Sequence, residues 1–194
     1  MADENWDTHA VRQYLDLQRE FQGSIMVLIS LFGGQMPRGT DLLAVAHCNS
    51  AANRRGVFIY EGKIAIMTQV NKARRATNRE FYVVRYLPDV LAPLLYNYLV
   101  YIRRFCNMLY RTCLELNMET LLLFPSVANP HEPRKTEELT KMLKICTENA
   151  IGIALGVRVY RQLTIAITEK HIRQTSRPFN HYDDTTSRAD SSVV

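Results

Sequence analysis

The chain of 194 residues carries a formal net charge of +5, and hydrophobic residues make up 47% of it. This composition fits one domain with a real apolar core. The longest apolar stretch, around Ile25 to Phe32, is too short to cross a bilayer, and the acidic start Met-Ala-Asp-Glu is the opposite of a signal peptide. We therefore expect an intracellular protein with no membrane partner. The positive excess is compatible with a polyanionic partner but does not require one.

The four cysteines form no Cys-x-x-Cys pair and have no neighbouring histidine at zinc-site spacing. Cys106 and Cys113 are seven residues apart, so on a helix they share a face and are expected to pack as small hydrophobic side chains. The sequence also lacks the Gly-x-x-x-x-Gly-Lys-Ser/Thr run of nucleotide-binding loops. We predict no disulfide, no metal and no cofactor.

Apolar residues recur at helical spacing over residues 8–32, which predicts a long first helix. Gly33 and Gly34 are expected to end it, because glycine adopts the left-handed turn that closes many helices. Pro37 is typical of a first helical turn and predicts a second helix reaching about residue 46. The polar segment 47–56 indicates a loop.

Two strands, 57–60 and 64–67, are predicted on either side of a tight turn at Glu61-Gly62-Lys63, and a third strand at 81–84. The connection 71–79 is the densest positive cluster in the chain. Its basic residues are Lys72, Arg74, Arg75 and Arg79. Such a cluster is commonly a solvated turn that favours solubility; alternatively, it contacts a phosphate backbone, since clustered Lys and Arg release counterions from nucleic acid.

The second half predicts a long helix from Pro88 to about residue 116, a buried extended piece at 121–124, a helix from Thr136, and a final helix over 157–172. Residues 174–194 have too few apolar side chains to bury and are expected to be disordered. The predicted fold class is α+β, mainly α-helical with a small antiparallel β-sheet. The predicted domain spans residues 1–173, followed by a tail at 174–194.

Two arginines lie where a positive charge needs a partner. Arg38 begins the second helix, where a cation opposes the helix dipole. Asp41 is either its surface ion-pair partner or the residue that orients it toward a phosphate. Arg161 lies in an otherwise apolar helix and needs a salt bridge or a ligand. Pairing of Arg161 with Asp41, Glu138 or Glu148 is the structural alternative.

The run Gly34-Gln-Met-Pro-Arg38-Gly-Thr-Asp-Leu-Leu43 resembles the segment around the first catalytic arginine of tyrosine recombinase-like domains in fungal mobile elements. Similar domains occur in fungal proteins with a RecQ-type helicase downstream. Further similar stretches follow in the same order, and the resemblance covers roughly residues 10 to 172. They include Arg55-Gly-Val-Phe-Ile-Tyr, Val84-Arg-Tyr-Leu-Pro88, and a last stretch that runs from Gly152-Ile-Ala-Leu155 through Tyr160-Arg161-Gln-Leu-Thr to Lys170-His171-Ile172.

The resemblance implies a DNA-binding recombinase scaffold. Arg38 and Arg161 match the two arginines that bind the scissile phosphate. Lys72 lies in the connection that carries the family's hairpin lysine, with Lys63 as a competing candidate. These three residues form the implied catalytic set, in vestigial form. The implied nucleic-acid-binding residues are Arg38, Lys72, Arg74, Arg75, Arg79, Arg158 and Arg161.

The chain also departs from the family pattern. Arg158 and Gln162 stand where the family usually has histidines, and the segment with the nucleophilic tyrosine has no counterpart here. Tyr182 follows Arg161 too closely, in a tail without the preceding apolar helix, so we do not assign it as the nucleophile.

We therefore expect a nuclear, DNA-binding remnant of a tyrosine recombinase-like domain, truncated before the nucleophile, that has lost strand transfer. It would derive from a transposable or helicase-associated element that carries out DNA integration and recombination. Its partner would be duplex DNA, on which the protein could form a homo-oligomer. Two alternatives stay open: a non-catalytic protein-interaction domain, and an active strand-transfer enzyme whose tyrosine is supplied elsewhere.

Overall fold

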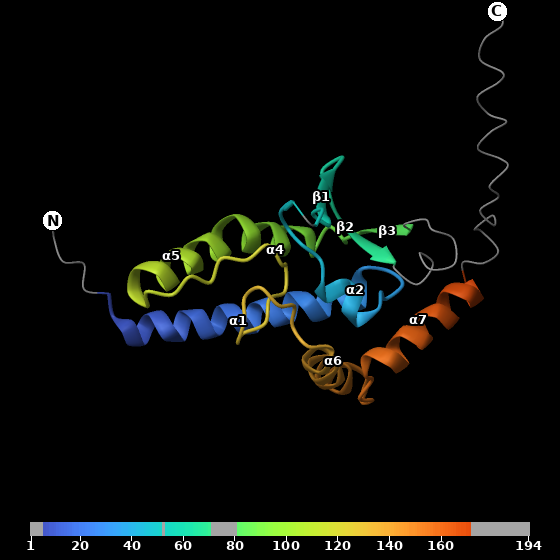
Figure 1. Cartoon of the computed structure of the whole chain (residues 1–194). Helices are drawn as coiled ribbons and strands as arrows, with labels where there is room; N and C mark the ends of the chain where they lie inside the picture. Colours follow the sequence, from blue (N-terminus) through green and yellow to red (C-terminus); the bar gives the residue numbers. More distant parts are fainter. Residues whose placement is uncertain (1–5, 52, 71–80, 172–194) are drawn as a thin grey trace, which may run out of the picture.

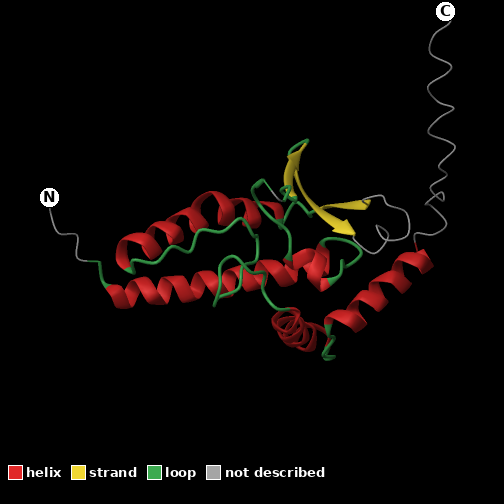
Figure 2. Cartoon of the chain, in the orientation of Figure 1, coloured by secondary structure: helices red, strands yellow, loops and turns green. Residues whose placement is uncertain are grey.

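The computed structural model describes residues 6–51, 53–70 and 81–171. These residues form an α+β fold in which helices predominate and a three-stranded antiparallel sheet packs at one end (Figures 1 and 2). The predicted fold class is confirmed at this level. The basic connection at 71–79 and the tail at 174–194 lie outside the described residues.

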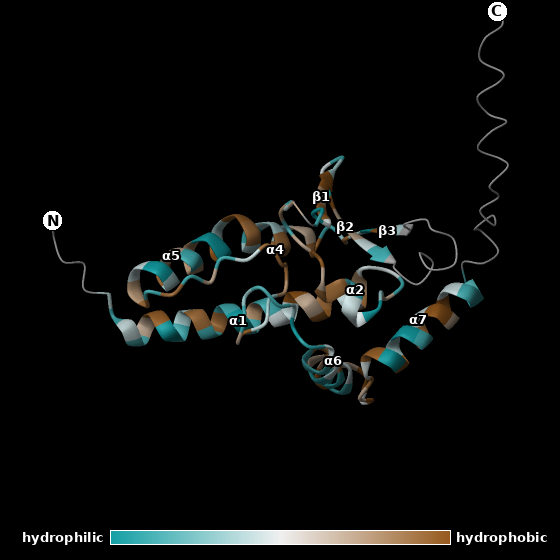
Figure 3. Cartoon of the chain, viewed as in Figure 1, coloured by the Kyte–Doolittle hydropathy of each residue, from teal (hydrophilic) through white to brown (hydrophobic). Residues whose placement is uncertain are grey.

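The long first helix, α1 (Thr8–Phe32), has the predicted bounds. Asp7 caps its start, because the carboxylate accepts hydrogen bonds from the backbone N–H groups of His9 (2.9 Å) and Ala10 (3.3 Å). Hydrophobic and hydrophilic residues alternate along the helix (Figure 3). At its end, Gly34 has φ +81°, the left-handed conformation expected of the closing glycine.

The second helix, α2 (Gly39–Leu43), is shorter than predicted, and Arg38 lies at its N-cap. Pro37 therefore precedes the helix and does not occupy its first turn. The chain leaves the helix because the next residues pair with the extended piece at 121–124. Val45 accepts a hydrogen bond from the Leu123 N–H, and the N–H of His47 donates to Leu121 (both 2.8 Å). Tertiary pairing outweighs local helical preference here.

The sheet consists of β1 (Val57–Tyr60), β2 (Lys63–Val70) and β3 (Phe81–Tyr86), in the order β1-β2-β3. Tyr60 pairs with Lys63, so Glu61 and Gly62 alone form the turn, with φ values of 49° and 75°. A two-residue turn with two positive φ angles matches the right-handed twist of a hairpin. The predicted hairpin is confirmed, with Lys63 in the strand.

The single helix predicted from Pro88 to residue 116 is divided into α4 (Ala92–Asn97), the π-helical turn η2 (Tyr98–Ile102) and α5 (Arg103–Cys113). The Pro88 carbonyl accepts from the N–H groups of Leu91 and Ala92, which forms a separate turn before the helix. The helix ends early because Glu115 adopts a left-handed φ of 53°.

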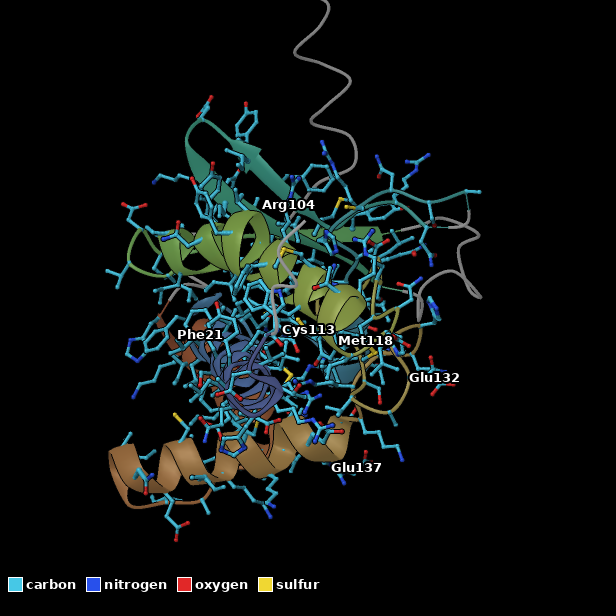
Figure 4. The ribbon with its side chains drawn as sticks, turned by 90° about the vertical axis from the view of Figure 1, so that its left-hand side faces the viewer. Phe21, Arg104, Cys113, Met118, Glu132 and Glu137 are labelled. Atoms are coloured by element: carbon cyan, nitrogen blue, oxygen red, sulfur yellow. The ribbon has the colours of Figure 1, made fainter. Side chains whose placement is uncertain are left out.

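The last two helices are α6 (Thr136–Ile151) and α7 (Val157–His171), close to their predicted bounds. Seen along α1, helix α5 lies on one side of α1 and α6 on the other (Figure 4). One core cluster joins α1 to α2, the sheet, α4 and α6, and a second, smaller one joins α1 to α5. Cys106 and Cys113 pack in the smaller cluster, as predicted from their spacing.

His47 connects the loop after α2 to the extended piece, because its Nε2 lies 3.1 Å from the Thr120 carbonyl oxygen. Burial, together with the charge of Arg103, lowers the pKa of His47 from 6.5 to about 4. Between about pH 6.5 and pH 4, His47 therefore binds a proton in the unfolded chain but not in the folded chain. The stability contributed by neutral His47 is complete above about pH 6.5 and is lost as the pH falls toward 4.

Acidification from pH 7 to pH 4 is thus expected to lower the free energy of unfolding through His47 by on the order of 1–2 kcal/mol, after allowance for its partial exposure. His47→Gln keeps an N–H for the Thr120 carbonyl and does not titrate. Urea unfolding at a series of pH values should give a flatter curve for the variant than for the wild type. Parallel curves would contradict this assignment.

Candidate functional site

The end of α1, the start of α2, the sheet and α7 meet around the turn at residues 33–38. The Tyr160 hydroxyl on α7 donates to the Leu31 carbonyl at 3.2 Å. The backbone N–H of Met36 donates to the Thr164 hydroxyl at 3.4 Å. These contacts place Arg161, which lies between Tyr160 and Thr164 on α7, beside the start of α2.

Asp41 lies at the centre of this site. Burial raises the pKa of its carboxyl above the ordinary value, while the charges of Arg38, Arg161 and Arg85 act in the opposite direction. The two arginines predicted from the sequence, Arg38 at the N-cap of α2 and Arg161 on α7, therefore lie near enough for their charges to act on the same carboxyl group. Within the described ranges, no ion pair of 4.0 Å or less joins any of the three arginines to Asp41. Asp41 thus lies in their shared field without neutralising one of them at contact distance.

Arg85 on β3 is the site residue that sequence reasoning did not assign. Its Nε donates to the Gln35 carbonyl at 2.9 Å, and its Nη1 donates to the Thr68 hydroxyl at 2.8 Å. Burial lowers the pKa of Arg85, Asp41 acts against that shift and Arg161 adds to it. Side chains alternate along a strand, so an arginine between exposed Val84 and Tyr86 faces the inner side of the sheet and needs partners there. That alternation was the available signal.

Arg161 carries an unsatisfied donor. Its Nε is buried and has no hydrogen-bond partner among the described residues. A buried N–H without a partner costs about 1–3 kcal/mol. The guanidinium of Arg38 has N–H donors and no acceptor, so it cannot cap the N–H groups at the start of α2. Among the described residues, three guanidinium groups act on this one carboxylate, and such an excess of positive charge favours an anionic ligand.

An open groove of about 1000 Å³ adjoins the site. Its lining includes Arg38 and Asp41 at the start of α2, Thr68 on β2, and Arg54 and Arg55 in the loop before β1. The site therefore opens onto a concave surface with further positive charge.

The other predicted nucleic-acid residues are placed less fully. Arg158 is exposed on α7, one turn before Arg161. Tyr182 lies outside the described residues. So do the remaining basic candidates, Lys72, Arg74, Arg75 and Arg79.

Among the described residues, no three His, Cys, Asp or Glu side chains gather as a metal site. Over the same ranges, no helix has the length and apolar character that crossing a bilayer demands. Comparisons with protein-family models, curated proteins and solved structures gave no match. A functional proposal therefore rests on the geometry of the site and on the sequence resemblance.

Proposed function

We propose that this domain binds the phosphate backbone of duplex DNA in the nucleus, with Arg38, Arg85 and Arg161 as phosphate ligands, as a tyrosine recombinase-like domain that no longer cuts DNA. The observation that carries the proposal is the convergence of these three arginines, from three separate elements, around Asp41. The unsatisfied Arg161 Nε supports it, because no acceptor among the described residues fixes this guanidinium at its buried end.

The three arginines have different parts in this proposal. Arg85 is held by Thr68 and Gln35, so its remaining N–H groups have a fixed direction before any ligand binds. Arg38 and Arg161 have unused donors and supply the forks that bind phosphate oxygens in pairs. The negative charge of Asp41 reduces the repulsion among the guanidinium groups. Two such forks would also stabilise the extra negative charge of a pentavalent phosphate in strand transfer.

Strand cleavage needs a tyrosine held within reach of the phosphorus. Beyond Arg161 the printed sequence has only Tyr182, which lies outside the described residues. DNA binding is therefore the activity we propose for this chain. A non-catalytic protein-interaction domain would not need these arginines to lie together, whereas the charges of Arg38 and Arg161 both act on Asp41, so DNA binding is favoured over it.

The test compares the wild type with the double variant Arg38→Ala/Arg161→Ala. Dissociation constants for a duplex oligonucleotide are measured by fluorescence anisotropy over a range of salt concentrations. Loss of two phosphate contacts should weaken binding about 10- to 100-fold and reduce the slope of log K against log salt by about 1.8. Folding should be unaffected, because removing Arg161 also removes an unsatisfied donor.

Arg12→Ala is the matched control. Arg12 is an exposed arginine near the start of α1, whereas the site lies beyond the end of this 25-residue helix. At about 1.5 Å per residue, the two are roughly 30 Å apart. The control should keep the wild-type affinity to within about twofold. Equal affinity and equal salt slope for the wild type and the double variant would refute the proposal. A covalent protein–DNA adduct on a suicide substrate would instead restore the strand-transfer alternative.

A further inference from the structure

A second hollow adjoins the groove beside Arg38. It has a volume of about 440 Å³ and lies between the loop after α2 and strands β1 and β2. Its lining residues are Asn49, Ser50, Asn53, Arg54, Arg55, Phe58 and Met67. Asn53, Arg54, Arg55 and Met67 also line the groove, so the two spaces adjoin.

The loop that forms this hollow is held by its own hydrogen bonds. Ser50 and Asn53 bond reciprocally, through the Ser50 N–H to the Asn53 carbonyl (2.8 Å) and the Asn53 N–H to the Ser50 hydroxyl (2.9 Å). Asn49 accepts the Arg55 N–H at 2.8 Å. Gly56 fixes the loop against the sheet, where an added Cβ would lie 2.5 Å from the Met67 carbonyl oxygen. The two arginines thus project from a preorganised backbone.

Arg55 has a second support. Its guanidinium carbon lies over the Phe58 ring, 5.1 Å from the ring centroid, while the residue remains exposed. A guanidinium held on an aromatic ring has a second face on which a planar group can stack, and Arg55 lines the hollow. Arginine planes and aromatic rings are surfaces on which unpaired bases stack. The polarizable Met67 side chain gives an apolar wall, and the side-chain amides of Asn49 and Asn53 supply N–H donors for a base edge.

We propose that this hollow binds an unpaired nucleobase, stacked on Arg55, next to the phosphate backbone in the groove. The proposal rests on the function proposed above, since the groove supplies the path of the backbone. Among the described residues that line the two spaces, Asp41 is the only acidic one, and it lies on α2 three positions after Arg38. An anionic strand with an extruded base matches both the charge and the aromatic and amide lining. The domain therefore prefers DNA with an unpaired base to a perfect duplex.

The test uses three probes: a perfect duplex, the same duplex with one unpaired adenine, and the same duplex with an abasic site in place of that adenine. Wild-type protein should bind the unpaired adenine about tenfold more tightly than the perfect duplex, because stacking of one base contributes on that scale. The abasic probe has the same flexibility but no base, and should bind like the perfect duplex. Equal affinity for all three probes would overturn the inference.

The variants separate stacking from charge. Arg55→Lys keeps the charge and loses the stacking plane, so the preference for unpaired adenine should disappear while the salt slope stays unchanged. Arg54→Lys is the matched control and should keep the preference. A preference retained by Arg55→Lys would overturn the stacking role. If Arg38→Ala/Arg161→Ala bound DNA as tightly as the wild type, the proposed phosphate site would be refuted. Loss of the adenine preference in Arg55→Lys would still support base binding in the hollow.

Discussion

Replacement of Phe124 by alanine is expected to lower the free energy of unfolding by about 3–5 kcal/mol. The Phe124 side chain is 0% exposed and lies in the main core cluster. Its backbone carbonyl also accepts the Arg134 N–H at 3.0 Å, so the residue is fixed within the extended piece at 121–124. Because the surrounding core is formed by helices and the sheet together, it cannot collapse fully into the space left by the ring.

Leu121→Ala is the matched control for this prediction. Leu121 belongs to the same extended piece but is 44% exposed, and its backbone carbonyl keeps the bond to His47 in the variant. Loss of the Leu121 side chain should lower the free energy of unfolding by less than about 1 kcal/mol. Urea unfolding of the three proteins measures both effects. Similar losses for the two variants would mean that this segment does not contribute to the core through Phe124.

The parts of the fold predicted from sequence are those that local pattern determines. The periodicity of residues 8–32 and the glycines after it predicted α1, and the turn at Glu61-Gly62 predicted the β1–β2 hairpin. The end of α2 was misplaced because Val45 pairs with Leu123, a partner 78 positions along the chain. Local pattern cannot reveal such a partner, and the same holds for the left-handed Glu115 that ends α5.

The residues of the candidate site were likewise predicted only where local sequence pattern determines them. Arg38 and Arg161 were found because each is a charge in an unfavourable local setting, one at a helix start and one in an apolar helix. Their convergence on Asp41 was left open, and the structure brings them together. Arg85 was missed because the strand was predicted to end at residue 84. Arg54 and Arg55 were passed over as part of a polar loop, since their partner Phe58 and the groove exist only in the folded chain.

A buried polar network holds α6 against α1 and so determines where α7 and Arg161 lie. Arg134, two residues before the first residue of α6, is 7% exposed. It donates to the Gln22 side-chain oxygen at 2.8 Å and to the carbonyls of Pro125 and Arg19 at 3.3 and 3.4 Å. Gln22 in turn donates to the Tyr98 hydroxyl at 2.8 Å. One guanidinium therefore joins α1, the loop before α6 and, through Gln22, helix η2.

Arg134→Ala is expected to lower the free energy of unfolding by about 3 kcal/mol, because it removes three charge-assisted hydrogen bonds and leaves the buried Gln22 oxygen without its donor. Arg134→Lys should recover less than half of the loss, since an ammonium group cannot reach three acceptors that a planar fork spans. Amide hydrogen exchange in α6 should accelerate in both variants, because its first turn loses its connection to α1.

Arg111→Ala gives the contrasting result. Arg111 forms an exposed ion pair with Glu119 at 3.0 Å, and such pairs contribute about 1 kcal/mol or less. Urea unfolding of the alanine variants should therefore separate the two arginines by about 2 kcal/mol or more. If Arg134→Ala were no more harmful than Arg111→Ala, the network would not hold α6 in place. The position of Arg161 beside Asp41 would then depend on the contacts of Tyr160 and Thr164 alone.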